Sequence, residues 1–226
     1  MHMAKPGLRA LGIAESFSGR AFSTMAGVVM RKDLRIDGVA IASLTVGGMD
    51  ATEAVLAIIA TLARRDINVA IVSGSVVAWF NILNPEAISA KTGLPLIVVT
   101  YEDSGGLEED ISHHFPGDQE RLRAYRNLGG RVPVQLRDGV RVFIRTTGLS
   151  HEDAAKILGD FTRDGKVPEP VRVARLVARP PVRPAPSGAG RRVGGEAAVG
   201  PAPTVASGTR RGEPTPRVVR SSSTWS

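Results

Sequence analysis

The fold is decided by residues 46–73, which read VGGMDATEAVLAIIATLARRDINVAIVS. From Val55 to Leu62 the apolar residues recur at the i, i+3, i+4, i+7 spacing of a helix that packs one face on a sheet. Val69–Val72 follows as a short apolar run, typical of a strand that is buried on both faces of a parallel sheet. The stretch therefore predicts an α/β fold.

The start of this helix carries two acids that need an interpretation. Asp50 precedes the apolar stripe and Glu53 follows three residues later, which is the spacing of a capping box. The alternative role for both carboxylates is metal binding. The strong preference for Asp at the N-cap favours capping over metal binding by about four to one.

Three extended runs come before the deciding stretch. They cover Leu8–Ile13, Ala21–Arg31 and Arg35–Val46, and connections this short allow only antiparallel neighbours. The crossover through the helix should then place Val69–Val72 parallel to the first strand. This is the strand order of a ribonuclease-H-like mixed sheet, in which the first and fourth strands lie side by side at the centre.

The second half of the chain continues the α/β pattern. The predicted elements are a helix at 84–92 entered through Asn84 and Pro85, a buried strand at 94–99, helices at 107–115 and 118–128, a hairpin of 132–136 and 140–144, and a helix capped by Ser150. Residues 167–178 follow, with no element assigned to them.

Composition bounds the class of protein. The 226 residues are 42% hydrophobic, enough for a sizeable core, but no apolar run approaches the roughly 18 residues of a membrane span. Residues 1–6 contain no apolar segment of signal-peptide type. The absence of cysteine excludes disulfides and thiolate nucleophiles and fits a reducing compartment. We therefore expect a cytoplasmic protein.

The positive charge is concentrated in the last part of the chain. Residues 179–226 hold eight arginines and two glutamates, so they carry +6 of the net charge of +7. They also hold eight prolines and seven glycines and show no apolar periodicity. We expect a folded domain over residues 1–178 and a disordered basic Arg/Pro/Gly/Ser-rich tail over 179–226. The candidate nucleic-acid contacts in this tail are Arg191, Arg192, Arg210 and Arg211.

In sheets of the predicted type, sites form where parallel strands end. Nucleases of this architecture hold divalent metal ions there with carboxylates. The equivalent positions here are Ala14, Gly47 or Gly48, and Ser73, none of which is charged.

The nearest acids to these strand ends are Glu15, Asp50 and Glu53, which are the candidate catalytic residues. Glu15 should point to the opposite side of its strand from Ala14.

Other polar and aromatic candidates have simpler interpretations. His113 and His114 are adjacent, so on a helix they diverge by roughly 100 degrees and cannot share a metal ion. Trp79 and Phe80 could stack on a base, but an aromatic pair after a buried strand is more often part of the core. The serines near the strand ends have no evident His and acid partners for nucleophilic catalysis.

Four motifs make the chain resemble a known family. They are Val46–Glu53 (VGGMDATE), Ser73–Asn81 (SGSVVAWFN), Gly93–Val99 (GLPLIVV) and Val167–Ala174 (VPEPVRVA). In this order, over about residues 8–178, they resemble the archaeal endonuclease-V-like family, also called domain-of-unknown-function family 99 and uncharacterised protein family 0215. The resemblance implies a ribonuclease-H-like fold and kinship with endonuclease V, a magnesium-dependent enzyme that cuts nucleic acid near deaminated bases.

The chain departs from the family pattern at the metal-binding positions. The resemblance implies an Asp where this chain has Ala14, another where it has Gly47, and a third where it has Ser73. A family glycine is replaced by Trp79 beside the expected site. All three expected carboxylates are therefore missing while the surrounding motifs persist.

Three functions follow as expectations. The first is an endonuclease-V-like protein without nuclease activity, with no resident metal or cofactor, that binds nucleic acid non-specifically. The second is an active Mg²⁺-dependent endonuclease that uses Glu15, Asp50 and Glu53 on deaminated, inosine-type nucleic acid. The third is a protein-interaction scaffold. None of the three involves a membrane.

Overall fold

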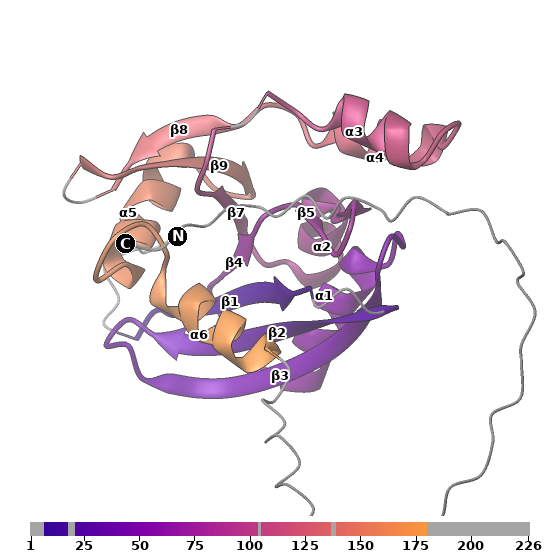
Figure 1. Ribbon diagram of the computed structural model, residues 1–226. Helices are drawn as coiled ribbons and strands as arrows, with labels where there is room; N and C mark the ends of the chain where they lie inside the picture. The colour runs from indigo at the N-terminus through magenta and orange to yellow at the C-terminus, as the bar shows by residue number, and fades with distance from the viewer. Residues whose placement is uncertain (1–6, 18–20, 104, 137–138, 180–226) are drawn as a thin grey trace, which may run out of the picture. The chain divides into compact units, whose positions relative to one another are not determined.

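The computed structural model describes residues 7–17, 21–103, 105–136 and 139–179. Their centre is a mixed sheet of seven strands in the order β3-β2-β1-β4-β7-β9-β8 (Figure 1). These strands are β1 (Arg9–Ser16), β2 (Phe22–Arg31), β3 (Ile36–Thr45), β4 (Val69–Ser73), β7 (Leu96–Thr100), β8 (Val132–Gln135) and β9 (Arg141–Thr147). A two-stranded ribbon of β5 (Val76–Val77) and β6 (Asn81–Ile82) follows β4.

The strand directions match the sequence-based prediction. The first three strands pair antiparallel, with Ile13 opposite Gly27 in the register of β1 and β2. Strand β4 then pairs parallel with β1 on one side and with β7 on the other. Strands β9 and β8 complete the sheet as an antiparallel hairpin beside β7. The prediction that the first and fourth strands are central neighbours is confirmed, and with it the ribonuclease-H-like order.

Helices cover both faces of the sheet. They are α1 (Ala51–Leu62), α2 (Pro85–Thr92), α3 (Glu108–His114), α4 (Gln119–Asn127), α5 (His151–Phe161) and α6 (Glu169–Ala178). Helices α1 and α2 share one apolar cluster with the sheet, and α5 and α6 share a second cluster with the opposite face. Helices α3 and α4 pack together in a third, smaller cluster with β6.

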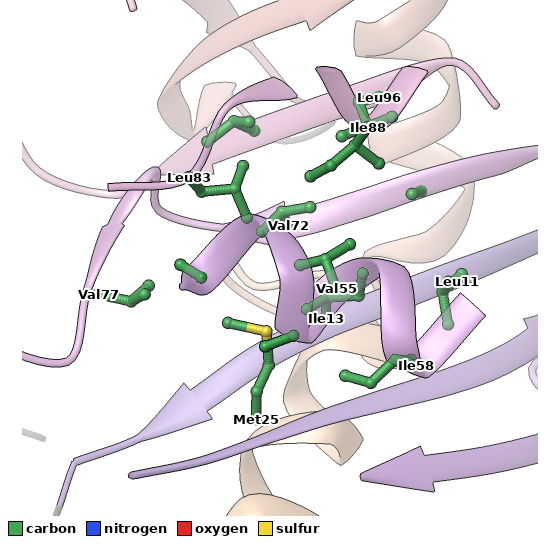
Figure 2. Packing of buried hydrophobic residues seen from close by; sticks show 14 of the residues in the cluster. Leu11, Ile13, Met25, Val55, Ile58, Val72, Val77, Leu83, Ile88 and Leu96 are labelled. Atoms are coloured by element: carbon green, nitrogen blue, oxygen red, sulfur yellow. The ribbon is translucent and has the colours of Figure 1, made fainter. Parts of the chain in front are cut away.

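The first of these clusters, which we call the α1 cluster, shows how strand alternation divides the core. Leu11 and Ile13 of β1 point into it and meet Val55 and Ile58 of α1 (Figure 2). Ala10 and Ala14, which alternate with them in the strand, face the cluster under α5 and α6, which we call the α6 cluster. Each face of β1 is thus buried, as expected for a central strand.

The two local capping predictions that involve Asn84 and Ser150 are confirmed. The Asn84 side chain accepts a hydrogen bond from the Ala87 N–H at 3.0 Å, and Pro85 occupies the first turn of α2. The Ser150 hydroxyl accepts from the Asp153 N–H at 3.1 Å and begins α5. In both cases the capping residue directly precedes its helix and bonds to an N–H three residues further on.

Helix α6 explains a glycine in the central strand. This helix occupies residues to which the sequence analysis assigned no element, and it packs on β1 and β2. A Cβ built on Gly12 would lie 2.2 Å from the carbonyl carbon of Pro170, so any side chain there would collide with the helix backbone. Glycine lets the first turn of α6 rest directly against the strand.

Within the described ranges, no helix has the length and apolar character needed to cross a membrane. The predicted basic tail lies outside the described residues from position 180 onward, and so do its four candidate arginines, Arg191, Arg192, Arg210 and Arg211.

Candidate functional site

The carboxyl ends of β1, β4 and β7 meet at one edge of the sheet, because the three strands run parallel. Ser73 is the last residue of β4 and lies on the face of the α6 cluster, two residues after Ile71. The Arg175 Nη2 of α6 donates a hydrogen bond to the Ser73 Oγ at 2.7 Å. The Arg175 guanidinium also lies over the ring of Tyr101, 4.8 Å from its centroid. A cation thus occupies the end of the central strand.

A second arginine reaches the same loop from β9. Arg145 Nη1 donates to the Ser75 Oγ at 3.2 Å, and its Nε and Nη2 donate to the Gly129 carbonyl at 3.2 and 3.0 Å. Burial, together with the positive charge of the nearby Arg131, lowers the pKa of the Arg145 guanidinium. The charges of Tyr125 and Glu86 oppose this shift only in part.

The hydroxyl of Tyr101 is buried beside this edge. It makes no hydrogen bond of ordinary geometry with the described part of the chain. Burial raises the pKa of the Tyr101 phenol, and the charge of Arg175 and the hydroxyl of Ser73 lower it in part. The hydroxyls of Tyr101 and Ser73 are thus neighbours, but their geometry falls short of an ordinary hydrogen bond.

Glu15 lies on the other face of β1, as predicted. Its carboxylate accepts a hydrogen bond from the Ser23 hydroxyl and contacts the backbone of Ala78, a residue of the α1 cluster, whereas Ala14 belongs to the α6 cluster. Burial raises the pKa of Glu15, and the hydrogen bonds from Ser23 and Ala78 lower it in part.

Asp50 does not cap helix α1, so the predicted capping box is wrong. Its carboxylate instead accepts from the N–H and hydroxyl of Thr45, at 3.0 and 2.8 Å, and from the Asn81 Nδ2 at 2.6 Å. The amide oxygen of Asn81 accepts from the Ala51 N–H at 2.9 Å and caps the helix in its place. The backbone of Asp50 (φ −106°, ψ 12°) lacks the extended conformation of a capping residue, which is the physical reason. Burial opposes ionisation, but the hydrogen bonds from Thr45 and Asn81 outweigh it and lower the pKa of Asp50.

Glu53 lies elsewhere, on the exposed side of α1. It lines a hollow of about 520 Å³ between α1, α2 and α4, together with Glu86, Lys91 and Arg123. Across residues 7–17, 21–103, 105–136 and 139–179, no three Asp, Glu or His side chains are grouped so that they could hold a metal ion. The structure thus gives Glu15, Asp50 and Glu53 separate surroundings.

The ribbon of β5 and β6 turns through three consecutive left-handed residues. Ala78, Trp79 and Phe80 have φ values of 39°, 62° and 58°. This conformation is strained for residues with side chains, and outside contacts hold it: the Gly47 N–H donates to the Ala78 carbonyl at 2.8 Å, and the buried Arg121 donates to the Phe80 carbonyl. The left-handed φ of Trp79 supplies a physical reason for the glycine that the family resemblance implies there.

Gly47 lies beside aromatic side chains and takes no part in the hydrogen bond between Arg175 and Ser73. Its φ is +70°, and a Cβ built on it would lie 3.4 Å from the Phe115 ring and 3.6 Å from the Trp79 ring. Arg121 donates to the Gly47 carbonyl at 2.9 Å. The position therefore has little space for a larger side chain.

The aromatic residues of the β5–β6 turn pack against the end of α3. Trp79 and His114 have ring centroids 4.8 Å apart, and Phe80 and Phe115 have centroids 6.0 Å apart. Trp79 and Phe80 are half-buried, whereas His113 and His114 are exposed. Trp79 and Phe80 therefore fit neither sequence-based interpretation fully. They pack against neighbouring rings, as core residues do, but part of their surface stays open, as base stacking would need.

Sequence reasoning missed the residues that form most of the polar contacts at this edge. Arg175 is 102 residues from Ser73, and Arg145 is 70 residues from Ser75. Neither arginine belongs to a recognisable spacing motif. The only available signal was that Arg175 follows the VPEPVRVA motif by one residue.

The seven-stranded order, with β1 and β4 parallel at its centre, defines an α/β protein with the ribonuclease-H-like fold. A family model described as endonuclease dU matches residues 6–181, so the chain belongs to this family. An uncharacterised protein family 0215 member from Pyrobaculum calidifontis is 38% identical over 170 residues, which cover 74% of this chain and 93% of that protein. The resemblance to the archaeal endonuclease-V-like family is thereby confirmed.

Solved structures support the same fold. A protein of unknown function from Archaeoglobus fulgidus superposes with a TM-score of 0.66 and 26% identity, covering 76% of this chain and 96% of that one. The catalytic domain of human endonuclease V gives a TM-score of 0.51 at 16% identity, over 78% and 84% of the two chains. A Ciona intestinalis endonuclease V, solved with a DNA that contains inosine, gives 0.50 at 15% identity, over 76% and 84%.

Proposed function

We propose that this chain is an endonuclease-V-like protein that binds nucleic acid without cleaving it. The observation that carries the proposal is the hydrogen bond of Arg175 to Ser73 at the end of the central strand. The family resemblance implies a metal-binding carboxylate at this position. The proposal places the protein in the cytoplasm, which its lack of cysteine supports.

The contact of Arg175 with Ser73 disfavours a divalent cation for a simple electrostatic reason. An ion of charge +2 held about 5 Å from a guanidinium would be repelled by roughly 7 kcal/mol at an effective dielectric constant of about 20. Mg²⁺ gives up part of its hydration only when anionic oxygens replace the water. Ser73 and Ala14 supply a hydroxyl and a methyl group instead.

Nucleic acid remains a fitting ligand in the absence of a metal. The Ciona intestinalis relative was solved with inosine-containing DNA, and the family description names dU. Arginines at the strand ends offer charge to phosphates, and the half-buried rings of Trp79 and Phe80 offer surface on which a base can stack.

Two assays with the full chain test the proposal. The first incubates the protein with Mg²⁺ or Mn²⁺ and oligonucleotides that contain inosine, dU or neither, and we expect no cleavage of any of them. The second measures binding of the same oligonucleotides in chelator at several salt concentrations, and we expect weak, salt-dependent binding. Metal-dependent cleavage at inosine or dU would establish the active nuclease instead. The absence of any salt-dependent binding would favour the scaffold.

The basic tail is part of the proposal. We propose that residues 179–226 contribute much of the affinity through Arg191, Arg192, Arg210 and Arg211, because this segment carries most of the net charge. Ala178 is buried and ends α6, so a chain that stops after Arg179 retains every described helix and strand. We expect the shortened chain to fold and to bind oligonucleotides more weakly, with a smaller salt dependence. Equal affinity in both chains would assign the binding to the domain alone.

A further inference from the structure

The two edge strands of the seven-stranded sheet differ in how well they are protected. Strand β8 has four residues and contains Pro133, which lacks an N–H, so it offers little for another strand to pair with. Strand β3 forms the opposite edge (Figure 1), has ten residues and contains neither proline nor lysine. Natural proteins use short strands, proline and lysine to prevent edge-to-edge pairing, because an open edge binds other strands. The edge at β3 carries none of these three safeguards.

The backbone groups of three residues in β3 point away from the sheet. The Thr45 N–H donates to the Asp50 carboxylate at 3.0 Å, on the side of β3 that faces away from β2. Successive residues of an antiparallel strand alternate between its two sides, so Val39, Ile41 and Ser43 turn their N–H and C=O groups in the same direction as Thr45. Within the described residues, no hydrogen bond outside the ladder with β2 involves these groups. They are therefore open to a further strand.

The side chains along this edge are apolar and uncharged. Val39 lies opposite Val28 of the α6 cluster in the register of β2 and β3, so Val39 and Ile41 point to the α6 face, where they are 49% and 61% exposed. Residues 38–45 contain no charged side chain. A second β3 strand can therefore pair antiparallel with the first about a two-fold axis without bringing like charges together. The edge is thus complementary to its own copy.

Helix α1, which lies on β3, leaves room for a neighbouring helix. Leu56 and Ile59 on one flank pack in the α1 cluster, which α2 also lines. Ala57 and Thr61 lie one turn apart on the other flank, and both are exposed. When two β3 strands pair about 4.8 Å apart, the helices that cover them come side by side, and small residues let two helices approach to about 8–10 Å. A second copy of the chain supplies such a helix.

We infer that two copies of this chain associate by antiparallel pairing of their β3 strands, with the two-fold axis at Ala40. Val39 of each copy then lies opposite Ile41 of the other, and each of these two pairs exchanges two backbone hydrogen bonds. The apolar side chains of each pair cover one another across the new ladder. The sheet becomes continuous through both copies. This association is independent of the proposed nucleic-acid binding, because it uses the opposite border of β1 and β2 from the strand ends of β4 and β7.

The first test measures the mass of the full chain in solution by sedimentation equilibrium. No oligonucleotide is present, and about 0.5 M salt screens the charge of the basic residues 179–226. We expect a particle of twice the 23.9 kDa of one chain. The melting temperature should also rise with protein concentration, because dilution dissociates the two copies. A chain that stays monomeric up to about 100 μM would overturn the inference and leave the edge at β3 to a strand of another protein.

Three lysine variants locate the contact. Ile41→Lys places a charge at the centre of the pairing and should raise the dissociation constant of the dimer at least about tenfold. Val132→Lys makes the same kind of change at an exposed apolar residue of the other edge strand, β8, and should leave the dimer intact. Leu176→Lys does so on the exposed side of α6 and should also leave it intact. A dimer that survives Ile41→Lys and dissociates in Leu176→Lys would overturn edge pairing and assign the contact to α6.

A cross-link tests the antiparallel register directly. The chain contains no cysteine, so Ala40→Cys introduces a single thiol that can form a disulfide only with a second copy. The inferred axis places the two Ala40 residues in a non-hydrogen-bonded pair, with Cα atoms about 4.5 Å apart, which is within the range of a disulfide. Mild oxidation should therefore give linked dimers on a denaturing gel, whereas Val132→Cys on the other edge should stay unlinked. Ala40→Cys chains that remain unlinked under the same oxidant would overturn pairing about Ala40.

Discussion

Replacing Asn81 with aspartate tests the polar network that starts helix α1. Asn81 is fully buried, and its amide nitrogen donates to the Asp50 carboxylate at 2.6 Å and to the Thr45 carbonyl at 2.9 Å. The change Asn81→Asp is nearly isosteric and keeps the oxygen that accepts from the Ala51 N–H. It removes both donated bonds and places a second carboxylate against Asp50.

The expected cost follows from these contacts. Losing one hydrogen bond to a charged group and one to a carbonyl removes about 2–4 kcal/mol. Two carboxylates about 4 Å apart would repel by roughly 4 kcal/mol at an effective dielectric constant of about 20, so the pair will bind a proton and raise its shared pKa. We expect the free energy of unfolding to fall by about 3–5 kcal/mol at neutral pH, and by less at acid pH, where the shared proton restores an O–H···O bond.

The free energy of unfolding should change with pH in opposite directions in the native chain and in the Asn81→Asp variant. In the native chain the pKa of Asp50 is lowered, so its contribution is present above the unfolded pKa of about 3.9 and is lost as the pH falls further. In Asn81→Asp the folded state binds more protons than the unfolded chain above that value, so stability falls as the pH rises. Urea titrations followed by tryptophan fluorescence at pH 5 and pH 7.5 measure the difference.

Two further variants serve as controls for the Asn81→Asp experiment. Asn127→Asp changes an exposed amide in α4 and should have little effect at either pH. The exchange Asp50→Asn with Asn81→Asp restores one amide and one carboxylate and should recover part of the loss. If Asn81→Asp behaves like Asn127→Asp at both pH values, the network does not contribute as argued.

Three further predictions concern the sheet and its edge. Gly12→Ala should destabilise the fold by about 1–3 kcal/mol in urea, whereas Gly130→Ala, whose Cβ meets open space, should not. Glu15→Gln should raise the melting temperature at pH 7 but not at pH 4, because the raised pKa of Glu15 makes its ionisation costly as the pH rises above about 4.3; an equal effect at both pH values would contradict this. Ser73→Asp should pair with Arg175 and show no stabilisation by Mn²⁺, whereas Ser73→Asp with Arg175→Gln should gain some; stabilisation of the single variant would refute the blocking role of Arg175.

The fold could be predicted from the sequence because its signals are local. The apolar run of β4 and the stripe of α1 identify a buried strand and its covering helix from a few neighbouring residues. Helix α6 was not assigned, because Pro168 and Pro170 suggest a break in structure. Both prolines instead lie at the start of the helix, where a missing N–H costs nothing.

Only the position of the candidate site, at the ends of the strands, could be predicted from the sequence. The strand ends were located correctly through Ser73, but the residues that now surround it come from distant parts of the chain. Asn81 caps a helix that begins 30 residues earlier, and Arg175 reaches Ser73 across 102 residues. Such pairings depend on how the helices pack on the sheet, so no spacing rule could have indicated them.

The packing of α6 on Gly12 has a consequence for how the protein is made. The strand at one end of the domain and the helix at the other each lack their partner until translation has passed Ala178. Contacts between residues so far apart in sequence form slowly and after the local ones. Strands β1 to β3 can therefore pair early on the ribosome, but one face of their sheet stays uncovered. During that interval the nascent chain is most exposed to aggregation and to chaperone binding.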